Sequence, residues 1–351
     1  MASQINVGMD LGSYKTAVMT SEGRRAVMPT VVGHPKDGIA RRLLKTDTVF
    51  GDAAIYNRHS LEIIRPLAFG RLKFVPSDVL DTHEQDVARI QLESLEKIVE
   101  HAFSLVGVQR GTAAAAMIGV PAVASSESKD LIVQVAEKVC HSVMVVSEPF
   151  AVAYGLDCLH NSLVIDIGAG TTDICALTGV FPPPEHQQTL TMGGDAIDAE
   201  LFKLLLAQYP TAICSPEMLR NLKERHGSLA EGISQVELTV VIEGKPIILN
   251  VAQQLRQACQ SLVEPVFNGI TKCLSIWDSE TQDRLLRNVI LAGGGSRMGG
   301  LDGVLERRLQ DYYGLARVSC VDDPVFSGAA GALKLAMEMP SEHWTMVRKA
   351  A

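Results

Sequence analysis

The sequence has few of the features that mark a nucleic-acid-binding protein. Aromatic residues make up 5% of the chain, and 32 Lys and Arg stand against 40 Asp and Glu, which leaves a net charge of -8. Proteins that bind nucleic acid over a wide surface usually carry a basic excess and aromatic side chains on which bases stack. The composition therefore argues against nucleic acid as a partner. A net charge is an average over the whole surface, however, so it is compatible with a local basic patch.

Paired cysteines, a leader and a long apolar segment are also missing. The seven cysteines are scattered, odd in number and contain no C-x-x-C pair, so we expect free thiols in a reducing compartment. The N-terminus has neither the basic nor the apolar region of a signal peptide. The longest apolar stretch, residues 113–124, contains Gly119 and Pro121 and is shorter than the roughly twenty residues of a membrane span. We therefore expect a soluble, cytoplasmic protein.

The length of 351 residues predicts about two domains. In the first half, the apolar pattern predicts a hairpin of strands at 5–11 and 16–20, and residues 33–66 are expected to form a small irregular insertion. The elements expected next are a helix around 87–106, a strand at 115–120, a helix at 126–140, a strand at 142–147 and a helix from Glu148. Such alternation is typical of an α/β layered fold.

A second α/β half is predicted from Asn161 onward. A buried strand at 163–167 passes through a Gly-rich turn into a strand at 171–177. The elements expected after it are a helix over 195–227, a hairpin over 236–249, a long helix from Val251, a strand at 289–292, a helix at 301–312, a short strand at 317–321 and a last helix.

The hairpins that open the two halves are similar to each other. Residues 10–18, D-L-G-S-Y-K-T-A-V, can be laid over residues 166–174, D-I-G-A-G-T-T-D-I. One Asp-x-Gly turn is weak evidence, because Asp and Gly are common turn residues. Two of them at the start of successive α/β halves predict a duplicated fold with a site between the halves.

Both turns have the chemistry to bind phosphate. A Gly-rich turn exposes backbone N–H groups to phosphate oxygens, and the hydroxyls of Ser13, Thr171 and Thr172 would add donors. Asp10 and Asp166 would repel phosphate unless a cation lay between them. Mg²⁺ binds carboxylate and phosphate oxygens while it keeps several waters, so the two carboxylates indicate Mg²⁺. The alternative is that both Asp side chains only cap their turns.

A third Gly-rich turn, at residues 291–297, follows an apolar strand and precedes a predicted helix. It is not the dinucleotide-binding fingerprint, because Met298 stands in place of the third glycine. The chain also lacks the P-loop pattern G-x-x-x-x-G-K-[ST], the His and Cys spacing of zinc sites and the hydrolase motif G-x-S-x-G. The chain thus has three turns suited to bind phosphate or nucleoside, but neither the dinucleotide-binding fingerprint nor the P-loop. Few families of nucleotide-binding proteins have this combination.

In this order, the three turns resemble the two phosphate loops and the adenosine motif of the actin/Hsp70/sugar-kinase ATPase superfamily, and the resemblance covers nearly the whole chain. Within the superfamily, the sequence is most similar to the magnetosome-associated bacterial actins. The segments that carry these resemblances are the connecting motifs at 118–122 and 323–332, the ribose and adenine segments at 193–198 and 222–224, the return from the MreB-type insertion at 65–67 with Gly70, and the shared stretches at 31–37, 147–150, 154–157 and 166–176.

The resemblance implies an actin-like ATPase fold, in which two duplicated α/β domains form four subdomains around a nucleotide cleft. The implied subdomains are IA at 1–33, 66–150 and 325–351, IB at 34–65, IIA at 151–208 and 253–324, and IIB at 209–252. Nucleotide would bridge both halves, so hydrolysis would change the preference between their orientations and couple ATP state to filament assembly.

The resemblance also implies hydrolysis of ATP by in-line attack of water on the γ-phosphate. Glu148 matches the Glu of bacterial actins that orients or deprotonates this water, and Thr171 would position it. Asp166, with help from Asp10, would hold Mg²⁺ mainly through water. The residues implied to contact ATP or ADP are Asp10, Gly12, Ser13, Tyr14, Lys15, Gly168, Gly170, Thr171, Thr172, Gly194, Asp195, Lys223, Glu224, Gly293, Gly294, Gly295, Ser296 and Arg297.

Three of these assignments have alternatives. Glu148 would also be favoured by the helix dipole, since it begins a helix. Lys15 either reaches the β-phosphate or points to solvent, because the phosphate-binding Lys of eukaryotic actin stands farther along the loop. Lys223 and Glu224 either border the base and ribose or are two solvated charges of a helix.

The resemblance implies a cytoplasmic homopolymer that aligns magnetosomes through linker proteins. Direct membrane insertion is not expected, since the first strand starts near Ile5 and leaves no room for an amphipathic helix before it. The alternatives are an MreB- or ParM-type filament with another cargo, a pilus-assembly actin homologue, or a sugar or acetate kinase, for which the chain shows no substrate Asp and no sugar-binding insertion. An Hsp70 chaperone is not expected, because no peptide-binding domain follows the last predicted helix.

Overall fold

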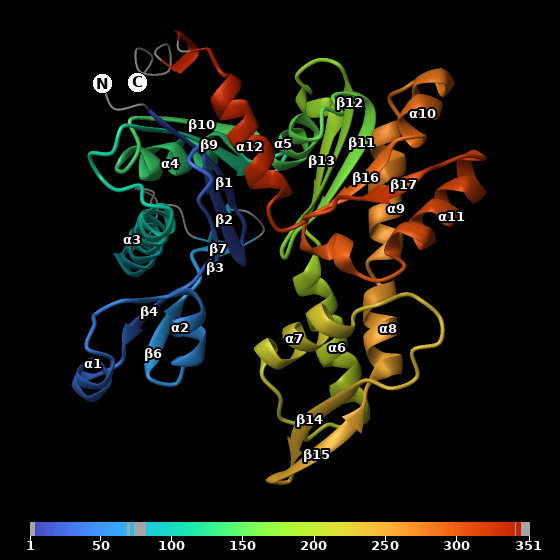
Figure 1. Cartoon of the computed structure of the whole chain (residues 1–351). Coiled ribbons are helices and arrows are strands. Elements are labelled where there is room, and N and C mark those ends of the chain that lie inside the picture. Colours follow the sequence, from blue (N-terminus) through green and yellow to red (C-terminus); the bar gives the residue numbers. More distant parts are fainter. Residues whose placement is uncertain (1–3, 69–70, 74–81, 341, 345–351) are drawn as a thin grey trace. The chain divides into compact units, whose positions relative to one another are not determined.

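The computed structural model describes residues 4–68, 71–73, 82–340 and 342–344. The chain divides into two compact units, Met1–Asp157 with Val325–Ala351, and Cys158–Pro324 (Figure 1). The sequence placed the first boundary after residue 150, but helix α5 (Glu148–Gly155) belongs to unit 1. Helix α5 belongs to unit 1 because it packs tightly against α12 (Ser327–Glu338) of that unit. A Cβ on Gly331 of α12 would lie 1.7 Å from the carbonyl oxygen of Ala151 in α5.

Unit 1 is built on a five-stranded sheet in the order β10-β9-β1-β2-β3. Its strands are β1 (Ile5–Leu11), β2 (Lys15–Thr20), β3 (Arg25–Pro29), β9 (Ala114–Val120) and β10 (Ser142–Ser147). Strands β1, β9 and β10 are parallel, while β2 and β3 continue the sheet antiparallel. All seven residues of β9 are buried, as expected for a strand that is covered on both faces.

Helices cover both faces of this sheet. The core on one face joins Val7 and Met9 of β1 to helices α3 (Thr82–Leu105) and α4 (Ser126–Glu137). On the other face α12 packs so closely that a Cβ on Gly8 would lie 2.1 Å from the carbonyl oxygen of Ala329 (Figure 1). Alternate residues of β1 therefore face two different helix layers.

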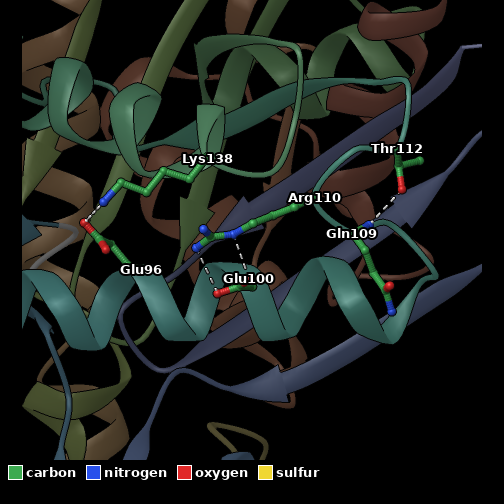
Figure 2. A network of polar contacts seen from close by, with 6 residues as sticks. All are labelled: Glu96, Glu100, Gln109, Arg110, Thr112 and Lys138. Carbon is green, nitrogen blue, oxygen red and sulfur yellow. Dashed lines mark hydrogen bonds and ion pairs between the residues drawn. The ribbon is translucent and has the colours of Figure 1, made fainter.

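The exposed side of α3 carries ion pairs to the segments that follow it. Figure 2 shows Lys138 paired with Glu96, and Arg110 with its Nε 3.0 Å from Oε1 of Glu100. Surface pairs of this kind contribute only about 0.2–1 kcal/mol each. They help to fix the outer layer of unit 1 and are not a candidate for the functional site.

Residues 33–66 are more regular than the sequence predicted. They contain a three-stranded sheet in the order β5-β4-β6, with a core of its own around Val31 and Leu61. The elements are β4 (Val32–Pro35), α1 (Gly38–Leu44), β5 (Val49–Phe50), α2 (Gly51–Tyr56) and β6 (Leu61–Ile64), and the hairpin of β7 (Leu67–Ala68) and β8 (Arg71–Leu72) follows them. The expectation of an irregular insertion was wrong because strands of two to four residues are too short to show a period.

Unit 2 is built on a second five-stranded sheet, in the order β13-β12-β11-β16-β17. Its strands are β11 (His160–Ile167), β12 (Thr172–Thr178), β13 (Gln187–Leu190), β16 (Val289–Ala292) and β17 (Val318–Cys320). The sheet has the same pattern as that of unit 1, since β11, β16 and β17 are parallel and β12 and β13 continue antiparallel. The duplicated fold predicted from the two hairpins is therefore confirmed.

The helices of unit 2 are shorter than the sequence predicted. The helix expected over 195–227 is two helices, α6 (Gly194–Gln208) and α7 (Pro216–His226), because Ser215 caps a new start and Pro216 occupies its first position. The long helix from Val251 is α8 (Ala252–Gln260), α9 (Val263–Leu274) and α10 (Ser279–Leu286). The remaining elements are η1 (Pro184–His186), β14 (Glu237–Ile242), β15 (Lys245–Asn250), η2 (Gly294–Arg297) and α11 (Leu301–Tyr313).

Among the described helices, none combines the length and hydropathy that crossing a membrane would require.

Strands β3 and β13 were not predicted from the sequence. Each is an edge strand, and most of its residues are half-buried or exposed.

Candidate nucleotide-binding site

Two predicted site residues of unit 1 lie at one edge of its sheet. Strands β1, β9 and β10 run parallel, with Asp10 paired to Gly119 and with Ser147 ending β10 one residue before Glu148. A Cβ on Gly119 would lie 3.4 Å from Cγ of Glu148 and 3.8 Å from Cα of Asp10. Gly119 therefore has both Glu148 and Asp10 as close neighbours at this strand end.

Glu148 is the first residue of α5 and is 8% exposed. A carboxylate in the first turn of a helix is favoured by the helix dipole, but a Glu that only serves the dipole is usually solvated. Burial at the carboxyl edge of three parallel strands is the position in which α/β proteins place functional side chains. The burial of Glu148 thus favours the catalytic assignment over the alternative.

Asp10 also contacts the first turn of α12. A Cβ on Gly328 would lie 2.9 Å from Oδ2 of Asp10. The positive end of a helix stabilises a nearby negative charge, so the start of α12 is a favourable neighbour for the Asp10 side chain. The motif at 323–332, which resembled the second connecting motif, is therefore brought to Asp10 by the return of the chain to unit 1.

The first turn is closed by its own backbone and held by Thr30. The N–H of Gly12 donates to the carbonyl of Lys15 at 3.1 Å, and the N–H of Thr30 donates to the carbonyl of Tyr14 at 2.7 Å. Tyr14 is 8% exposed, whereas Lys15 is exposed and its Nζ lies 5.8 Å from the centre of the Tyr14 ring. The exposure of Lys15 is compatible with both of its alternatives.

The second turn, in unit 2, repeats the bond that closes the first. The N–H of Gly168 donates to the carbonyl of Thr171 at 2.9 Å, at the place where Gly12 bonds Lys15 in unit 1. Thr171 is 6% exposed, and the hydroxyl of the fully buried Thr172 donates to the carbonyl of Met192 at 2.8 Å. Thr172 is thus engaged in holding the turn, which leaves Thr171 as the better hydroxyl for a ligand.

The third turn lies directly over Asp166. Asp166 pairs with Ala292 across β11 and β16, and a Cβ on Gly293 would lie 2.4 Å from Oδ1 of Asp166. Gly293 also has a φ of +73°, which a side chain would disfavour. The Ser296 hydroxyl donates to the Gly293 carbonyl at 2.8 Å and so tightens this turn.

Other residues of the third turn differ in their exposure. Gly294 and Arg297 are exposed, and a Cβ on Gly294 would meet nothing within 4 Å. A Cβ on Gly295, in contrast, would lie 2.2 Å from Cγ2 of Ile167. Gly295 is therefore needed for close packing on β11, while Gly294 leaves an open surface that a ligand could contact.

Helix α6 begins on the second turn. The N–H of Gly194 donates to the carbonyl of Gly168 at 3.0 Å, and the N–H of Asp195 donates to that of Ala169 at 2.8 Å. A Cβ on Gly193 would lie 2.5 Å from the Gly168 oxygen. The start of α6 and the second turn therefore form one backbone unit, and two predicted contact residues, Gly194 and Asp195, belong to it.

A cluster of charges joins α6 to α7. Lys223 donates to the Gly194 carbonyl at 2.6 Å and pairs with Oδ1 of Asp198 at 2.8 Å. Arg220 pairs with Asp195 at 2.7 Å and with Asp198 at 3.4 Å. Burial raises the pKa of the Asp198 carboxyl, although Lys223 and Arg220 oppose this shift. The cluster fixes Lys223 against the start of α6, whereas Glu224 is exposed on α7.

The carboxylates of Asp10 and Asp166 offer oxygen ligands. In the described part of the chain, no group of three or more His, Cys, Asp or Glu could hold a metal ion. Mg²⁺ needs only one or two carboxylates when phosphates and waters supply the other ligands. Asp166, 6% exposed at the open end of β11, and Asp10 have the oxygen chemistry for this role.

Each unit therefore holds part of the predicted site. Unit 1 brings together Asp10, Gly12, Ser13, Tyr14, Lys15 and Glu148, and unit 2 brings together Asp166, Gly168, Gly170, Thr171, Thr172, Gly194, Asp195, Lys223, Gly293, Gly294, Gly295 and Ser296. Sequence reasoning assigned no site role to Thr30, Asp198, Arg220 or Gly328. Two of these had a signal, because Asp198 closes the segment at 193–198 and Gly328 lies in the motif at 323–332, both of which were singled out.

Known proteins resemble this chain over most of its length. The family model described as MreB/Mbl protein matches residues 84–343. The actin-like protein MamK of Paramagnetospirillum magneticum is 38% identical over 342 residues, which are 97% of this chain and 95% of that protein. A MamK double helical filament has a TM-score of 0.88 at 37% identity, covering 96% of this chain and all of its own. A non-polymerising MamK mutant bound to AMPPNP has a TM-score of 0.69 at 37% identity, covering 96% and 99%.

Proposed function

Because this chain belongs to the MamK group of the MreB/Mbl family of actin-like, filament-forming proteins, we propose that it hydrolyses Mg-ATP and couples hydrolysis to filament assembly. Its filament would position magnetosomes into chains in the cytoplasm, through linker proteins. The family is ATP-binding, and a MamK structure similar to this chain was obtained with AMPPNP. Hydrolysis, magnesium, the linkers and the residues of the site are the parts that we propose here.

The observation that carries the proposal is the matched pair of turns. The N–H of Gly12 donates to the Lys15 carbonyl at 3.1 Å and the N–H of Gly168 donates to the Thr171 carbonyl at 2.9 Å, each directly after a strand whose next-to-last residue is an aspartate. Duplicated phosphate turns, each with a carboxylate beside it, suit a nucleotide whose phosphates and metal are shared by two halves.

The three carboxylates divide two tasks in the proposed reaction. Glu148 orients the attacking water and accepts its proton as the bond from water to the γ-phosphorus forms and the bond from that phosphorus to the β–γ bridging oxygen breaks, which releases ADP and phosphate. Asp166 and Asp10 would hold Mg²⁺ mainly through water, and the bound ion would neutralise charge on the phosphates. Thr171, with its hydroxyl at the end of the second turn, would help to position the attacking water.

Coupling to assembly follows from the two-unit division. The chain crosses between the units at two places, after Asp157 and after Pro324. A nucleotide held by both units would favour one relative orientation, and loss of the γ-phosphate would change that preference. Filament contacts that differ between the orientations would then depend on the nucleotide. The filament contacts would be made by the four proposed subdomains, which include IB at 34–65 and IIB at 209–252.

The catalytic assignment is tested with Glu148→Gln, using Glu127→Gln as the matched control. Glu127 also lies in the first turn of a helix, α4, but is exposed there and was not assigned to the site. We expect Glu148→Gln to bind ATP and sediment with it, and to release phosphate about 10²–10⁴-fold more slowly. The control should match wild type in all three measurements.

Two results would count against the proposal, and they differ. Unchanged phosphate release by Glu148→Gln would remove its catalytic role. If wild-type protein sediments equally with Mg-ATP, ADP and no nucleotide, the coupling of ATP to assembly is wrong. Phosphate transfer that rises only with an added sugar or acetate would favour a kinase instead.

A further inference from the structure

Thr30 makes two hydrogen bonds to the first phosphate turn. Its N–H donates to the Tyr14 carbonyl at 2.7 Å, and its hydroxyl donates to the Gly12 carbonyl at 2.8 Å. Thr30 is fully buried, as is Thr16, whose hydroxyl oxygen lies 2.9 Å from that of Thr30. Since the one hydroxyl proton of Thr30 is used on Gly12, Thr16 is the donor in this contact. The result is a buried series of two hydrogen bonds, from the Thr16 hydroxyl to the Thr30 hydroxyl and from there to the Gly12 carbonyl.

These bonds fix the direction of the peptide groups in the turn. In a trans peptide the C=O and the following N–H point to opposite sides of the chain. Because the Gly12 carbonyl points to Thr30, the N–H of Ser13 points away from it. The Tyr14 carbonyl orients the N–H of Lys15 in the same way. A phosphate-binding turn depends on the direction of such N–H groups.

Thr30 also begins the path into the small sheet β5-β4-β6. The next residue, Val31, accepts a hydrogen bond from the N–H of Gly51 at 3.0 Å, and Gly51 is the first residue of α2. Strand β4 starts directly afterwards at Val32. One residue thus separates the side chain that holds the phosphate turn from the frame of the small sheet.

The other end of the small sheet contacts the same turn. Arg65 follows β6 directly, and its guanidinium lies 4.8 Å from the centre of the Tyr14 ring, within the range of a cation–π contact. The segment between Thr30 and Arg65 therefore leaves and rejoins the rest of unit 1 at the first turn. A change in the conformation of the turn would therefore alter the contacts of both Thr30 and Arg65.

We infer that Thr30 is a positioning residue, which holds the Gly12 and Tyr14 carbonyls so that the turn presents its N–H groups to phosphate and which passes the state of the turn to the small sheet. This inference rests on the proposed function, since it assumes that nucleotide phosphate occupies the turn. It assigns to the small sheet a nucleotide-dependent conformation that starts from one hydroxyl group.

The test compares Thr30→Val, which removes the hydroxyl at nearly constant shape, with Thr30→Ser, which keeps it. The control is Thr20→Val, at the opposite end of β2, where a buried threonine hydroxyl is 3.5 Å from the Arg24 carbonyl. We expect Thr30→Val to bind a fluorescent ATP analogue about tenfold more weakly, the effect of one lost hydrogen bond. Thr30→Ser and Thr20→Val should bind within about twofold of wild type, a change below the effect of one hydrogen bond.

Hydrogen exchange gives the readout that a merely structural role would not change. In wild type, Mg-ATP should slow exchange of the Gly51 amide relative to the nucleotide-free protein. The slowing should be lost in Thr30→Val at saturating ATP and restored in Thr30→Ser. If Thr30→Val does not fold, Thr16→Val replaces it, because that variant removes only the donor to Thr30 and should show a smaller loss of the same two signals.

The outcomes separate this inference from the proposed function. Wild type that fails to bind ATP refutes the proposed function itself. Wild type that binds ATP, together with a Thr30→Val variant that binds equally and keeps the ATP-dependent protection of Gly51, overturns the role of Thr30 alone. Equal weakening in Thr20→Val and Thr30→Val would also overturn it, because the effect would then be general destabilisation.

Discussion

Replacing Lys223 with Met should destabilise unit 2 more than replacing Asp198 with Asn, although the two side chains form one ion pair. Lys223→Met leaves a buried carboxylate whose remaining partner is Arg220 at 3.4 Å, and Arg220 is shared with Asp195 at 2.7 Å. Removing one partner of a buried ion pair costs about 3–5 kcal/mol. In Asp198→Asn, Lys223 keeps the Gly194 carbonyl at 2.6 Å and Arg220 keeps Asp195, so the loss should be about 1–2 kcal/mol.

The direction of the pKa shift gives the pH dependence of this difference. Burial raises the pKa of Asp198 above its usual value, so between the unfolded and folded pKa values the folded protein binds more protons. The contribution of Asp198 is therefore fully present below about pH 4, the unfolded value, and is lost as pH rises through the folded pKa. The advantage of wild type over Asp198→Asn should shrink over that range.

Urea unfolding followed by tryptophan fluorescence measures both effects. A Trp344→Phe background leaves Trp277 of unit 2 as the reporter, since these are the two tryptophans of the chain. The reasoning fails if Asp198→Asn loses as much stability as Lys223→Met, or if the advantage of wild type over Asp198→Asn grows as pH rises from 4. A nucleotide-binding measurement on the same variants then shows whether Lys223 also contacts the ligand.

Two further predictions concern a close helix contact and a stacked histidine. Gly331→Ala should lower the free energy of unfolding, measured by heat or urea, by about 3 kcal/mol or more, because the new Cβ would lie 1.7 Å from the Ala151 oxygen, closer than in ordinary overpacking. The control Gly303→Ala, whose Cβ would meet nothing within 4 Å, should instead raise the free energy of unfolding by about 0.5–1 kcal/mol. His101 stacks on Phe50 at 4.2 Å, and burial lowers its pKa. Stability should therefore fall as pH drops below about 6.5, the unfolded value, and a His101→Phe variant that keeps this slope in pH-dependent unfolding would contradict the assignment.

Much of the candidate site could be predicted because its signals are local. Asp10 and Asp166 are each the next-to-last residue of an apolar strand that leads into a Gly-containing turn, and such a turn needs only neighbouring residues to form. Glu148 was assigned from the family resemblance, and its local context, directly after a strand and at the start of a helix, agrees with that assignment. The duplicated topology followed from the likeness of the two hairpins.

Short elements and helix breaks were predicted less well. The strands at residues 32–64 are too short to show a period, and the break between α6 and α7 depends on where Pro216 and its cap are placed. In the region from Val251 onward, Pro265 lies in the first turn of α9 and supplies no N–H for a continuous helix.

The sequence by itself determined which residues could bind phosphate and metal, because strand ends, glycines and carboxylates are adjacent along the chain. Only the tertiary structure decided which distant groups hold them. Thr30 reaches Gly12 because β2 pairs with β3 in the register that places Lys15 opposite Pro29. Gly328 reaches Asp10 because the chain returns to unit 1 after Pro324. Contacts of this kind depend on pairing and packing between segments that no local pattern relates.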